Sequence, residues 1–309
     1  MAERRDQNAQ SGELSLRTAV NIWLEHLRND RGRSVSTVRE YRRDHADFSR
    51  HLDRDDIHTP SAVRQEHVAR YILSLKRRLS VRSRIRRFVA IRAFFRFSTA
   101  QGWIRSDPTG DLRPPASSVA SQPRILSYQE VEAIIRAPNR AGRKGVRDAA
   151  VFALMYTTGM KVSEVIALTL NDVDFVKGVV RVARGARFER TVPVRDEALL
   201  TLRTYVTRAR AELQAKALRG RAPYDPLGLF LTEAGDVPTP RSIARALEKA
   251  ARAAGIRGPL GREVLRRSFA VHLFEAGAEM RVIQALLGQA TLKSTQQYVG
   301  LHGTKRAAC

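Results

Sequence analysis

The sequence predicts a two-domain protein: an all-α N-terminal domain, followed by a mainly α domain with a small antiparallel β-sheet. Three observations predict this fold class. The chain has 309 residues, which suggests two domains at roughly 150 residues each. Apolar residues recur at helical spacing through the first third, whereas short strand-like runs occur only later. Between the two patterns, residues 106–124 are rich in proline and serine, so we expect an extended linker there.

Four helices are expected in the first domain, residues 13–105, after a disordered tail over residues 1–12. Apolar side chains at steps of three and four place one face of each helix toward a common core. Thr37 and Glu40 have the spacing of a capping box at the start of the second helix, and Gly102 ends the fourth. The apolar positions are Leu16, Val20, Trp23, Leu24 and Leu27; Val38, Tyr41, His45, Phe48 and Leu52; Val63, Val68, Tyr71, Ile72 and Leu75; and Ile85, Phe88, Val89, Phe94 and Phe95.

A second capping box, Ser127 with Glu130, opens the second domain, residues 125–309. Its apolar pattern is mixed, with helical periods interrupted by short runs that alternate or are continuously apolar. Such runs suit two or three antiparallel strands in a helical domain. Helices are expected over 127–136, 146–158, 162–168, 196–216, 240–254, 262–276 and 279–287, and strands over 173–175, 178–182 and 191–194.

The chain is strongly basic. It has 55 Lys and Arg against 31 Asp and Glu, a formal charge of +24, and 47 of the basic residues are arginines. Arginine binds phosphate through two parallel hydrogen bonds and stacks on bases. A polyanion is therefore the expected partner, and nucleic acid is the leading candidate.

Basic residues are concentrated on the fourth helix and its approach, and no acidic residue stands between them. A solvated helix face is the alternative interpretation, but such a face normally mixes charges of both signs. We expect a phosphate-binding surface, because arginines without balancing acids repel one another unless a polyanion neutralises them. The run consists of Lys76, Arg77, Arg78, Arg82, Arg84, Arg86, Arg87, Arg92 and Arg96.

The common catalytic and metal-binding motifs are missing: there is no P-loop, no strand-linked GxGxxG and no HExxH. Cys309 is the only cysteine, which excludes an intrachain disulfide and fits a reducing, cytoplasmic compartment. Asp172 and Asp174 could hold Mg²⁺, but such a pair more often caps a helix or shapes a turn, so no metal site is expected. No apolar run approaches the roughly 18 residues of a membrane span, and the N-terminus lacks the apolar core of a signal peptide.

Four segments of the second domain resemble the tyrosine recombinase/integrase family, that is, the phage integrases and Xer-type recombinases. The resemblance covers nearly the whole chain, and its specificity lies in the order and spacing of the segments rather than in any one of them. The segments are 157–174 (TTGMKVSEVIALTLNDVD), the basic hairpin 182–194, 265–273 (LRRSFAVHL) and 286–298, in which LLGQ precedes TQQY.

This resemblance implies a tyrosine recombinase catalytic fold for the second domain and a core-binding, DNA-gripping role for the first. The implied activity is site-specific recombination, in which a tyrosine attacks a DNA phosphodiester, forms a 3′-phosphotyrosine link and frees a 5′-hydroxyl. No metal or other cofactor takes part. The implied partner is double-stranded DNA with paired half-sites, bound by a homo- or hetero-oligomer, dimer to tetramer, on the nucleoid in the cytoplasm and without a membrane.

Two positions match the family's catalytic pattern. Tyr298 stands where the nucleophile stands, and Arg266 stands where the second phosphate-binding arginine stands. Arg267 occupies the place of a histidine that usually follows that arginine. We expect Arg267 and Arg187, in the basic hairpin, to bind DNA together with Arg77, Arg78, Arg82, Arg84, Arg86 and Arg87 of the first domain.

Three further positions depart from the pattern but keep part of its chemistry. Lys161 replaces the first arginine, which keeps the positive charge but loses the two-pronged grip on phosphate. Arg184 replaces the hairpin lysine, in a loop that looks one residue longer, and arginine is a poor proton donor because its pKa is so high. Gln289 replaces a histidine or tryptophan and can still donate a hydrogen bond to a phosphate oxygen.

Glu263 is the departure with the largest chemical consequence, because it replaces a histidine with an anion near a phosphate. It could pair with Arg266 or Arg267, and Arg266 could then be a core ion-pair partner. Alternatively, Glu263 could take the proton of the tyrosine as a base. The sequence leaves two main hypotheses open: an atypical but working recombinase, or a catalytically silent relative that binds DNA as an accessory or regulatory factor. A helix-turn-helix protein of the transcription-factor type is a weaker third, because it does not explain the spacing of Tyr298 or the basic hairpin.

Overall fold

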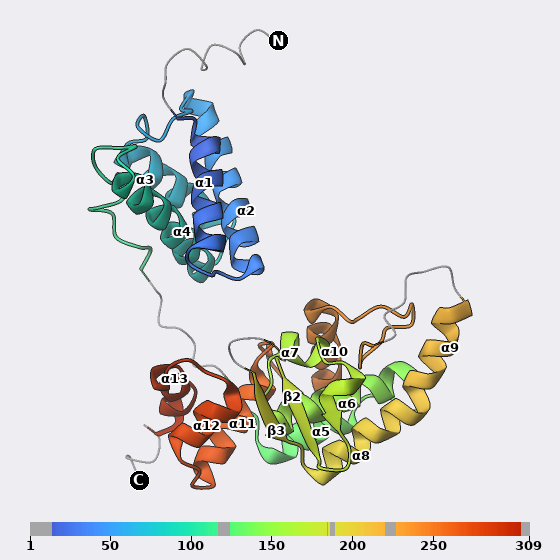
Figure 1. The fold of residues 1–309 in the computed structure, drawn as a ribbon. Helices are drawn as coiled ribbons and strands as arrows, with labels where there is room; N and C mark the ends of the chain where they lie inside the picture. Colours follow the sequence, from blue (N-terminus) through green and yellow to red (C-terminus); the bar gives the residue numbers. More distant parts are fainter. Residues whose placement is uncertain (1–13, 117–123, 184, 186–188, 220–226, 304–309) are drawn as a thin grey trace. The chain divides into compact units, whose positions relative to one another are not determined.

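The computed structural model describes residues 14–116, 124–183, 185, 189–219 and 227–303. The chain divides into two compact units, Met1–Ala120 and Ser121–Cys309, and each is described by itself (Figure 1). The expected disordered tail, part of the expected linker, and the hairpin residues Arg184 and Arg187 lie outside the described residues.

The first unit contains the four expected helices. They are α1 (Leu16–Asn29), α2 (Val35–Leu52), α3 (Gln65–Ser74) and α4 (Val81–Ala100), with 3-10 turns η3 (Asp53–Asp55) and η4 (Leu75–Arg77). Ser15, Ser34 and Ser80 are the N-caps of α1, α2 and α4, and each accepts a hydrogen bond from a backbone N–H that the helix cannot pair. The capping box predicted at Thr37 and Glu40 is wrong, because α2 already begins after Ser34.

An aromatic cluster fills the core of the first unit. Trp23 is 1% exposed; its ring stacks on Tyr41 at 5.5 Å between centroids and meets Phe94 at 5.8 Å in an edge-on arrangement. His45 lies against the same indole, and burial lowers its pKa to about 4, so the neutral imidazole packs there. The helical faces predicted from apolar spacing therefore do form one core. The prediction is wrong for Val89, which is 49% exposed on the outer side of α4.

The first residues of the expected linker are tied to the first unit. Nη2 of Arg92, on α4, donates to the carbonyl oxygen of Thr109 at 2.9 Å and also to that of Leu112. Oδ1 of Asp107 accepts from the backbone N–H of Thr109 at 2.7 Å, which closes the turn. Residues 107–112 thus pack on α4 instead of being extended, and the outer domain bounds stay a prediction.

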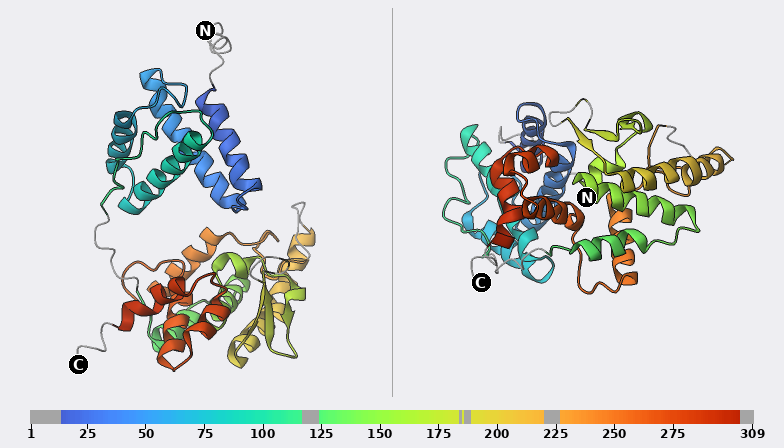
Figure 2. Two further views of the ribbon diagram at one scale, coloured as in Figure 1. Left: turned by 60° about the vertical axis from the view of Figure 1, so that its left-hand side comes forward. Right: turned by 90° about the horizontal axis from the view of Figure 1, so that it is seen from below.

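The second unit is mainly helical around a three-stranded antiparallel sheet of order β1-β2-β3. Its elements are α5 (Tyr128–Arg136), α6 (Arg143–Thr158), α7 (Val162–Ile166), η5 (Leu170–Asp172), β1 (Val173–Asp174), β2 (Val179–Val182), β3 (Arg190–Pro193), α8 (Asp196–Thr204), the π-helical η6 (Tyr205–Arg210), α9 (Ala211–Arg219), α10 (Pro240–Ala253), α11 (Val264–Glu275), α12 (Met280–Leu287) and α13 (Leu292–Gly303). Figures 1 and 2 show α8, η6 and α9 as one long helical rod, which the sequence predicted as a single helix.

The sheet and the central helix α6 share one core. Val180 faces Val192 in the register of β2 and β3, and both are buried, as is Val182. Helix α6 contacts α5, α8 and α11, so the rod and α11 pack directly on it. The buried valines of the sheet belong to the same apolar cluster as the buried residues of α6. The predicted capping box of Ser127 and Glu130 is confirmed at the start of α5.

Helix α13, which carries Tyr298, was not predicted from the sequence. The carboxylates of Asp172 and Asp174 accept backbone N–H groups at the start of η5 and in the turn after β1, so both shape local turns as expected. Within the described part of the chain, no helix is both long enough and apolar enough to cross a bilayer.

Candidate nucleophile site on helix α11

Helix α11 positions three of the residues singled out in the sequence. Glu263 is its N-cap, and Arg266 and Arg267 lie in its first turn. Residues three and four apart on a helix share one face, so these side chains leave the same side of α11. Arg266 contacts the segments around Gly159 and Leu287, whereas Glu263 and Arg267 both contact Tyr298 on α13.

Arg266 joins two of the motif segments from inside the protein. It is 1% exposed; Nη1 donates to the carbonyl oxygen of Gly159 and Nη2 to that of Leu287, both at 2.8 Å. Its ion pair among the described residues is with Glu164, at 3.7 Å, so the suggested pairing with Glu263 is wrong. Arg266 thereby fixes the segment before Lys161 against the end of α12.

Two glycines allow these segments to approach so closely. Gly159 has φ +63°, and a Cβ there would lie 2.4 Å from Cδ1 of Phe269 on α11. Gly288 has φ +60°, and its Cβ would lie 2.5 Å from Nη1 of Arg190. A side chain at either position would meet both backbone strain and a clash. The glycines of the TTG and LLG segments are therefore required by packing around Arg266 and Arg190.

Tyr298 lies on α13 and reaches α11 with both its hydroxyl and its ring. The hydroxyl donates a hydrogen bond to Oε2 of Glu263 at 2.6 Å. The guanidinium carbon of Arg267 lies 5.2 Å from the ring centroid, within cation–π range. Burial raises the pKa of Tyr298, and the hydrogen bond and charge of Glu263 raise it further, against a smaller lowering by Arg266. At rest Tyr298 is therefore a neutral phenol.

Arg190 belongs to this site and was missed in the sequence. Its side chain on β3 is 9% exposed, and Nη1 and Nη2 donate to the two carboxylate oxygens of Glu164 at 3.2 and 3.0 Å. Nε donates to the carbonyl oxygen of Leu286 at 2.7 Å. Burial alone raises the pKa of Glu164, but bonds from Arg190 and the Lys161 N–H, with the charges of Arg190 and Arg266, leave it lowered. A bidentate, mostly buried pair thus joins the hairpin to α7 and α12.

Lys161 and Gln289 present further polar groups near this cluster, with Lys161 exposed and Gln289 half-buried. Lys161 is exposed at the N-cap of α7, and its backbone N–H donates to Oε2 of Glu164 at 2.8 Å. Oε1 of Gln289 accepts from Oγ1 of the buried Thr295 at 2.6 Å, which orients the amide. The amide NH₂ of Gln289 has no partner among the described residues, so it is available to donate. Arg266 holds the segments of Lys161 and Gln289. It bonds the carbonyl oxygens of Gly159 and Leu287, which lie two positions before these residues.

The basic hairpin leaves the sheet beside the same cluster. Val182 pairs with Arg190 at the open end of β2 and β3, so the intervening loop starts next to Glu164. Arg184 and Arg187 lie in that loop, outside the described residues. Their roles stay a prediction.

The arginine run of the first unit is only partly free to bind a polyanion. Asp44 and Asp47 of α2 face α4: Arg86 bonds both carboxylate oxygens of Asp44, and Arg87 bonds Asp47. Nη2 of Arg78 lies 3.5 Å from Asp47. The expectation that no acid balances this run is therefore wrong for these three arginines, because the acids come from a distant helix.

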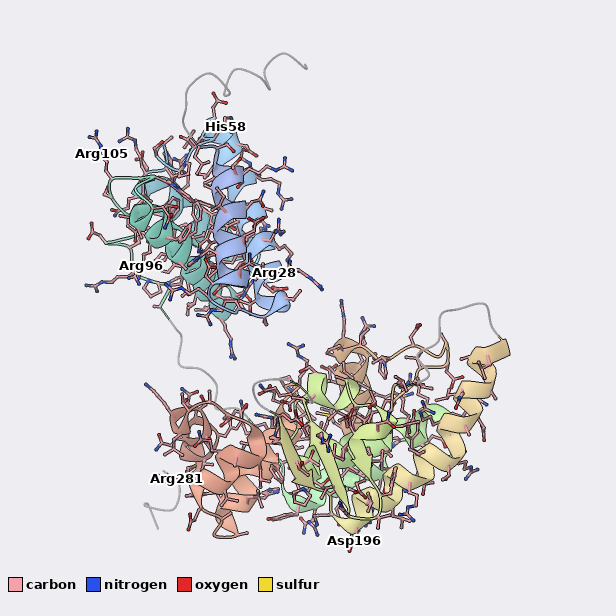
Figure 3. The ribbon with its side chains drawn as sticks, in the orientation of Figure 1. Arg28, His58, Arg96, Arg105, Asp196 and Arg281 are labelled. Atoms are coloured by element: carbon pink, nitrogen blue, oxygen red, sulfur yellow. The ribbon has the colours of Figure 1, made fainter. Side chains whose placement is uncertain are left out.

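Burial separates the members of the run further. Arg87 is 7% exposed and also donates to the Tyr71 hydroxyl at 2.7 Å, so it is part of the core. Arg84 is partly buried, whereas Arg77 and Arg82 are exposed. Among further exposed arginines of this unit, Figure 3 labels Arg28, Arg96 and Arg105. The DNA-binding role stays a prediction for Arg77, Arg78, Arg82 and Arg84.

Comparison with known proteins agrees with this arrangement. The sequence matches the model of the phage integrase family over residues 124–304 and that of the phage integrase N-terminal SAM-like domain over residues 20–102. It is 34% identical over 289 residues to the tyrosine recombinase XerD of Mycobacterium tuberculosis, which covers 89% of this chain and 90% of that protein. It is 35% identical over 279 residues to XerD of Pseudomonas putida, with 90% and 91% covered.

Solved structures share the fold at lower sequence identity. A lambda integrase dimer bound to a COC′ core site superposes with a TM-score of 0.69 at 18% identity, covering 94% of this chain and 97% of that one. The XerH site-specific recombinase bound to palindromic difH gives 0.70 at 17% identity, covering 89% and 79%. With both family models matched and relatives above 30% identity over most of the chain, the protein belongs to the phage integrase family and is a tyrosine recombinase of the Xer type.

Proposed function

We propose that this chain is a site-specific DNA recombinase that breaks and rejoins duplex DNA through a 3′-phosphotyrosine link on Tyr298. The observation that carries the proposal is the approach of Tyr298 to α11. Its hydroxyl donates a hydrogen bond to Glu263 at the start of α11. The same helix carries Arg266, which bonds the segments of Lys161 and Gln289. These contacts support Tyr298 as the nucleophile, because α11 connects it with the segments that carry Lys161 and Gln289.

The step is a transesterification at phosphorus. Oη of Tyr298 forms a bond to the phosphorus, and the bond from phosphorus to the 5′ oxygen breaks. A 5′-hydroxyl from another strand reverses the exchange, so the bond energy is kept. Charge on the non-bridging oxygens would be met by the exposed Lys161 ammonium and the Gln289 amide, with Arg266 adding positive charge from within the core.

The partner in this proposal is duplex DNA. The charge of +24 and the exposed arginines of the first unit support phosphate binding. Related solved structures are a lambda integrase dimer on a core site and a lambda integrase tetramer on a Holliday junction. We extend this to the present chain as a dimer on paired half-sites that assembles into a tetramer, alone or with a partner recombinase, on the nucleoid.

A silent DNA-binding relative is the second hypothesis. Such a protein needs the same basic surface to bind DNA, but DNA binding alone gives no reason for an ordered contact between Tyr298 and α11. The hydrogen bond of 2.6 Å from Tyr298 to Glu263 therefore favours the enzyme.

The test is covalent capture on nicked DNA. Selection from randomised duplexes first supplies a binding site. A suicide substrate with a nick beside the cleaved bond then traps the phosphotyrosine complex, which denaturing electrophoresis resolves. We expect capture by the native chain, none by Tyr298→Phe, and no effect of a chelator. Capture that persists in Tyr298→Phe, or that needs Mg²⁺, would refute the assignment of the nucleophile.

A further inference from the structure

Tyr298 lies between an acid and an arginine that stand one helical turn apart on α11. Oε2 of Glu263 accepts the hydrogen bond from the hydroxyl, and the guanidinium of Arg267 lies over the ring. The two side chains come from positions i and i+4 of one helix, and the backbone N–H of Arg267 also bonds the carbonyl oxygen of Glu263 at 2.8 Å. The same short stretch of backbone therefore fixes both groups relative to the phenol.

Neither group is occupied elsewhere among the described residues. Oε2 of Glu263 has Tyr298 as its hydrogen-bond partner, and the ion pairs of Arg266 and Arg190 go to Glu164 instead. Nε of Arg267 is buried without a partner. A salt bridge that served only to staple α11 would show Glu263 bonded to Arg267, whereas here the carboxylate is directed at the hydroxyl.

The neutral phenol of Tyr298 must lose its proton to act as a nucleophile. Burial and Glu263 both raise the pKa of Tyr298, so hardly any phenolate exists at neutral pH before the reaction. The proton must then leave as the bond to phosphorus forms, and this requires a base within hydrogen-bond reach. The carboxylate of Glu263, at 2.6 Å, meets that geometric condition.

We propose that Glu263 and Arg267 act on Tyr298 as a charge-balanced pair, in which Glu263 accepts the phenolic proton and Arg267 stabilises the oxygen charge that develops. The inference rests on the proposed recombinase function. In the forward step the proton moves from Oη to Oε2 of Glu263 while Oη bonds to phosphorus, and the departing 5′ oxygen takes a proton from water. In the reverse step the attacking 5′-hydroxyl loses its proton to the hydroxide that the water left, and its oxygen bonds to phosphorus. The bond from phosphorus to Oη breaks, and Glu263 returns its proton to Oη of Tyr298.

Pairing with Arg267 offsets the repulsion between the Glu263 carboxylate and a DNA phosphate. A lone carboxylate would repel the non-bridging oxygens, at a cost that grows as water is excluded. Arg267 brings the formal charge of the pair to zero, so the base can stay close to the nucleophile without net repulsion. The two residues should consequently depend on each other, and this makes the proposal testable.

The experiment measures single-turnover capture on the nicked substrate with Glu263→Gln, Arg267→Gln and the double variant. Glutamine keeps an acceptor for the phenol but is not a base at neutral pH. We expect Glu263→Gln to slow capture by about 10²-fold or more and Arg267→Gln by about tenfold, with DNA affinity nearly unchanged for Glu263→Gln. The double variant should be slower by much less than the product, because the two groups act on one proton. Glu263→His, which restores a base, should recover most of the rate.

The matched control is a second Glu–Arg pair at the same helical spacing. Glu132 and Arg136 on α5 form an i, i+4 pair of 3.5 Å, and no described contact links them to Tyr298. Glu132→Gln and Arg136→Gln should leave capture unchanged.

A spectroscopic readout keeps the base assignment independent of turnover. The tyrosinate absorbance of the native chain minus that of Tyr298→Phe gives the titration of Tyr298, and Glu263→Gln should shift it to lower pH. An unshifted titration, or capture by Glu263→Gln at the native rate, overturns the proposal while leaving the recombinase function intact. Failure of the native chain to form any covalent complex instead overturns the proposed function, and the present inference with it.

Discussion

Each unit contains a buried cluster in which arginines pair with carboxylates from a distant part of the chain. In the first unit, Asp44 and Asp47 both lie on α2 and Arg86 and Arg87 both lie on α4. The carboxylate of Asp44 is fully buried and serves both arginines. This cluster joins two helices of one bundle and contains no residue of the motif segments.

The cluster of the second unit uses the same groups to join four elements. Glu164 of α7 pairs with Arg190 of β3 and Arg266 of α11, and the arginines also bond the carbonyl oxygens of Leu286 and Leu287 at the end of α12. Those elements carry or adjoin the predicted catalytic positions. The role of a buried arginine therefore depends on the elements it connects. One cluster fixes a helix pair, and the other fixes the segments around the proposed nucleophile Tyr298.

The largest expected effect is loss of stability when the first cluster is broken. Asp44→Ala removes the buried carboxylate of Arg86 and leaves Arg87 with Asp47 alone. Removing one partner of a buried ion pair costs about 3–5 kcal/mol. Both tryptophans of the chain, Trp23 and Trp103, lie in the first unit. Their fluorescence in urea therefore reports the free energy of unfolding of that unit alone. A loss below about 1 kcal/mol would show that the cluster is not structural.

A conservative change in the second cluster should slow covalent capture more than it lowers the free energy of unfolding. Arg190→Lys keeps the charge but loses the bidentate bond to Glu164 and the bond to Leu286. We expect capture to slow by about 10- to 100-fold at saturating DNA, because small misplacements around a reacting centre are costly. Arg143→Lys is the control, since Arg143 also bonds two carboxylates but is 39% exposed at the side chain. Equal effects of the two variants would contradict the comparison.

A smaller gain is expected at Lys161. Lys161→Arg adds a two-pronged donor at an exposed position, where no described side chain opposes it. If about 1.4 kcal/mol of transition-state binding returns, capture becomes about tenfold faster. The same change combined with Glu263→His tests whether both positions act on one phosphate, because the effects should then not add. Slower capture in Lys161→Arg would instead mean that the site has been reshaped around lysine.

The sequence predicted the elements well and the site in part. Helical spacing placed the core helices, and the motif segments led to Tyr298 and Arg266, because local pattern and order along the chain carry that information. The contacts of Arg86 with Asp44 join residues 42 positions apart, and no local pattern reveals them. Arg190 was missed because an arginine beside a strand is expected to be exposed, and its burial depends on contacts with α7 and α12, which the local sequence does not reveal. Helix α13 was missed because glycines and neighbouring glutamines obscure its apolar spacing.

The smallest expected effect separates a free arginine from a paired one on the same helix. Arg82 is exposed and has no ion pair among the described residues, whereas Arg86 is held by Asp44. Each phosphate contact contributes about 0.9 to the slope of the logarithm of affinity against the logarithm of salt concentration. Arg82→Ala should therefore flatten the slope by about 0.9, which is roughly a threefold smaller loss of affinity between about 50 and 200 mM salt. Arg86→Ala should leave the slope unchanged and instead lower the stability of the first unit, since its charge is already neutralised by a carboxylate. Equal slopes for the native chain and Arg82→Ala would remove this helix face from the DNA-binding surface.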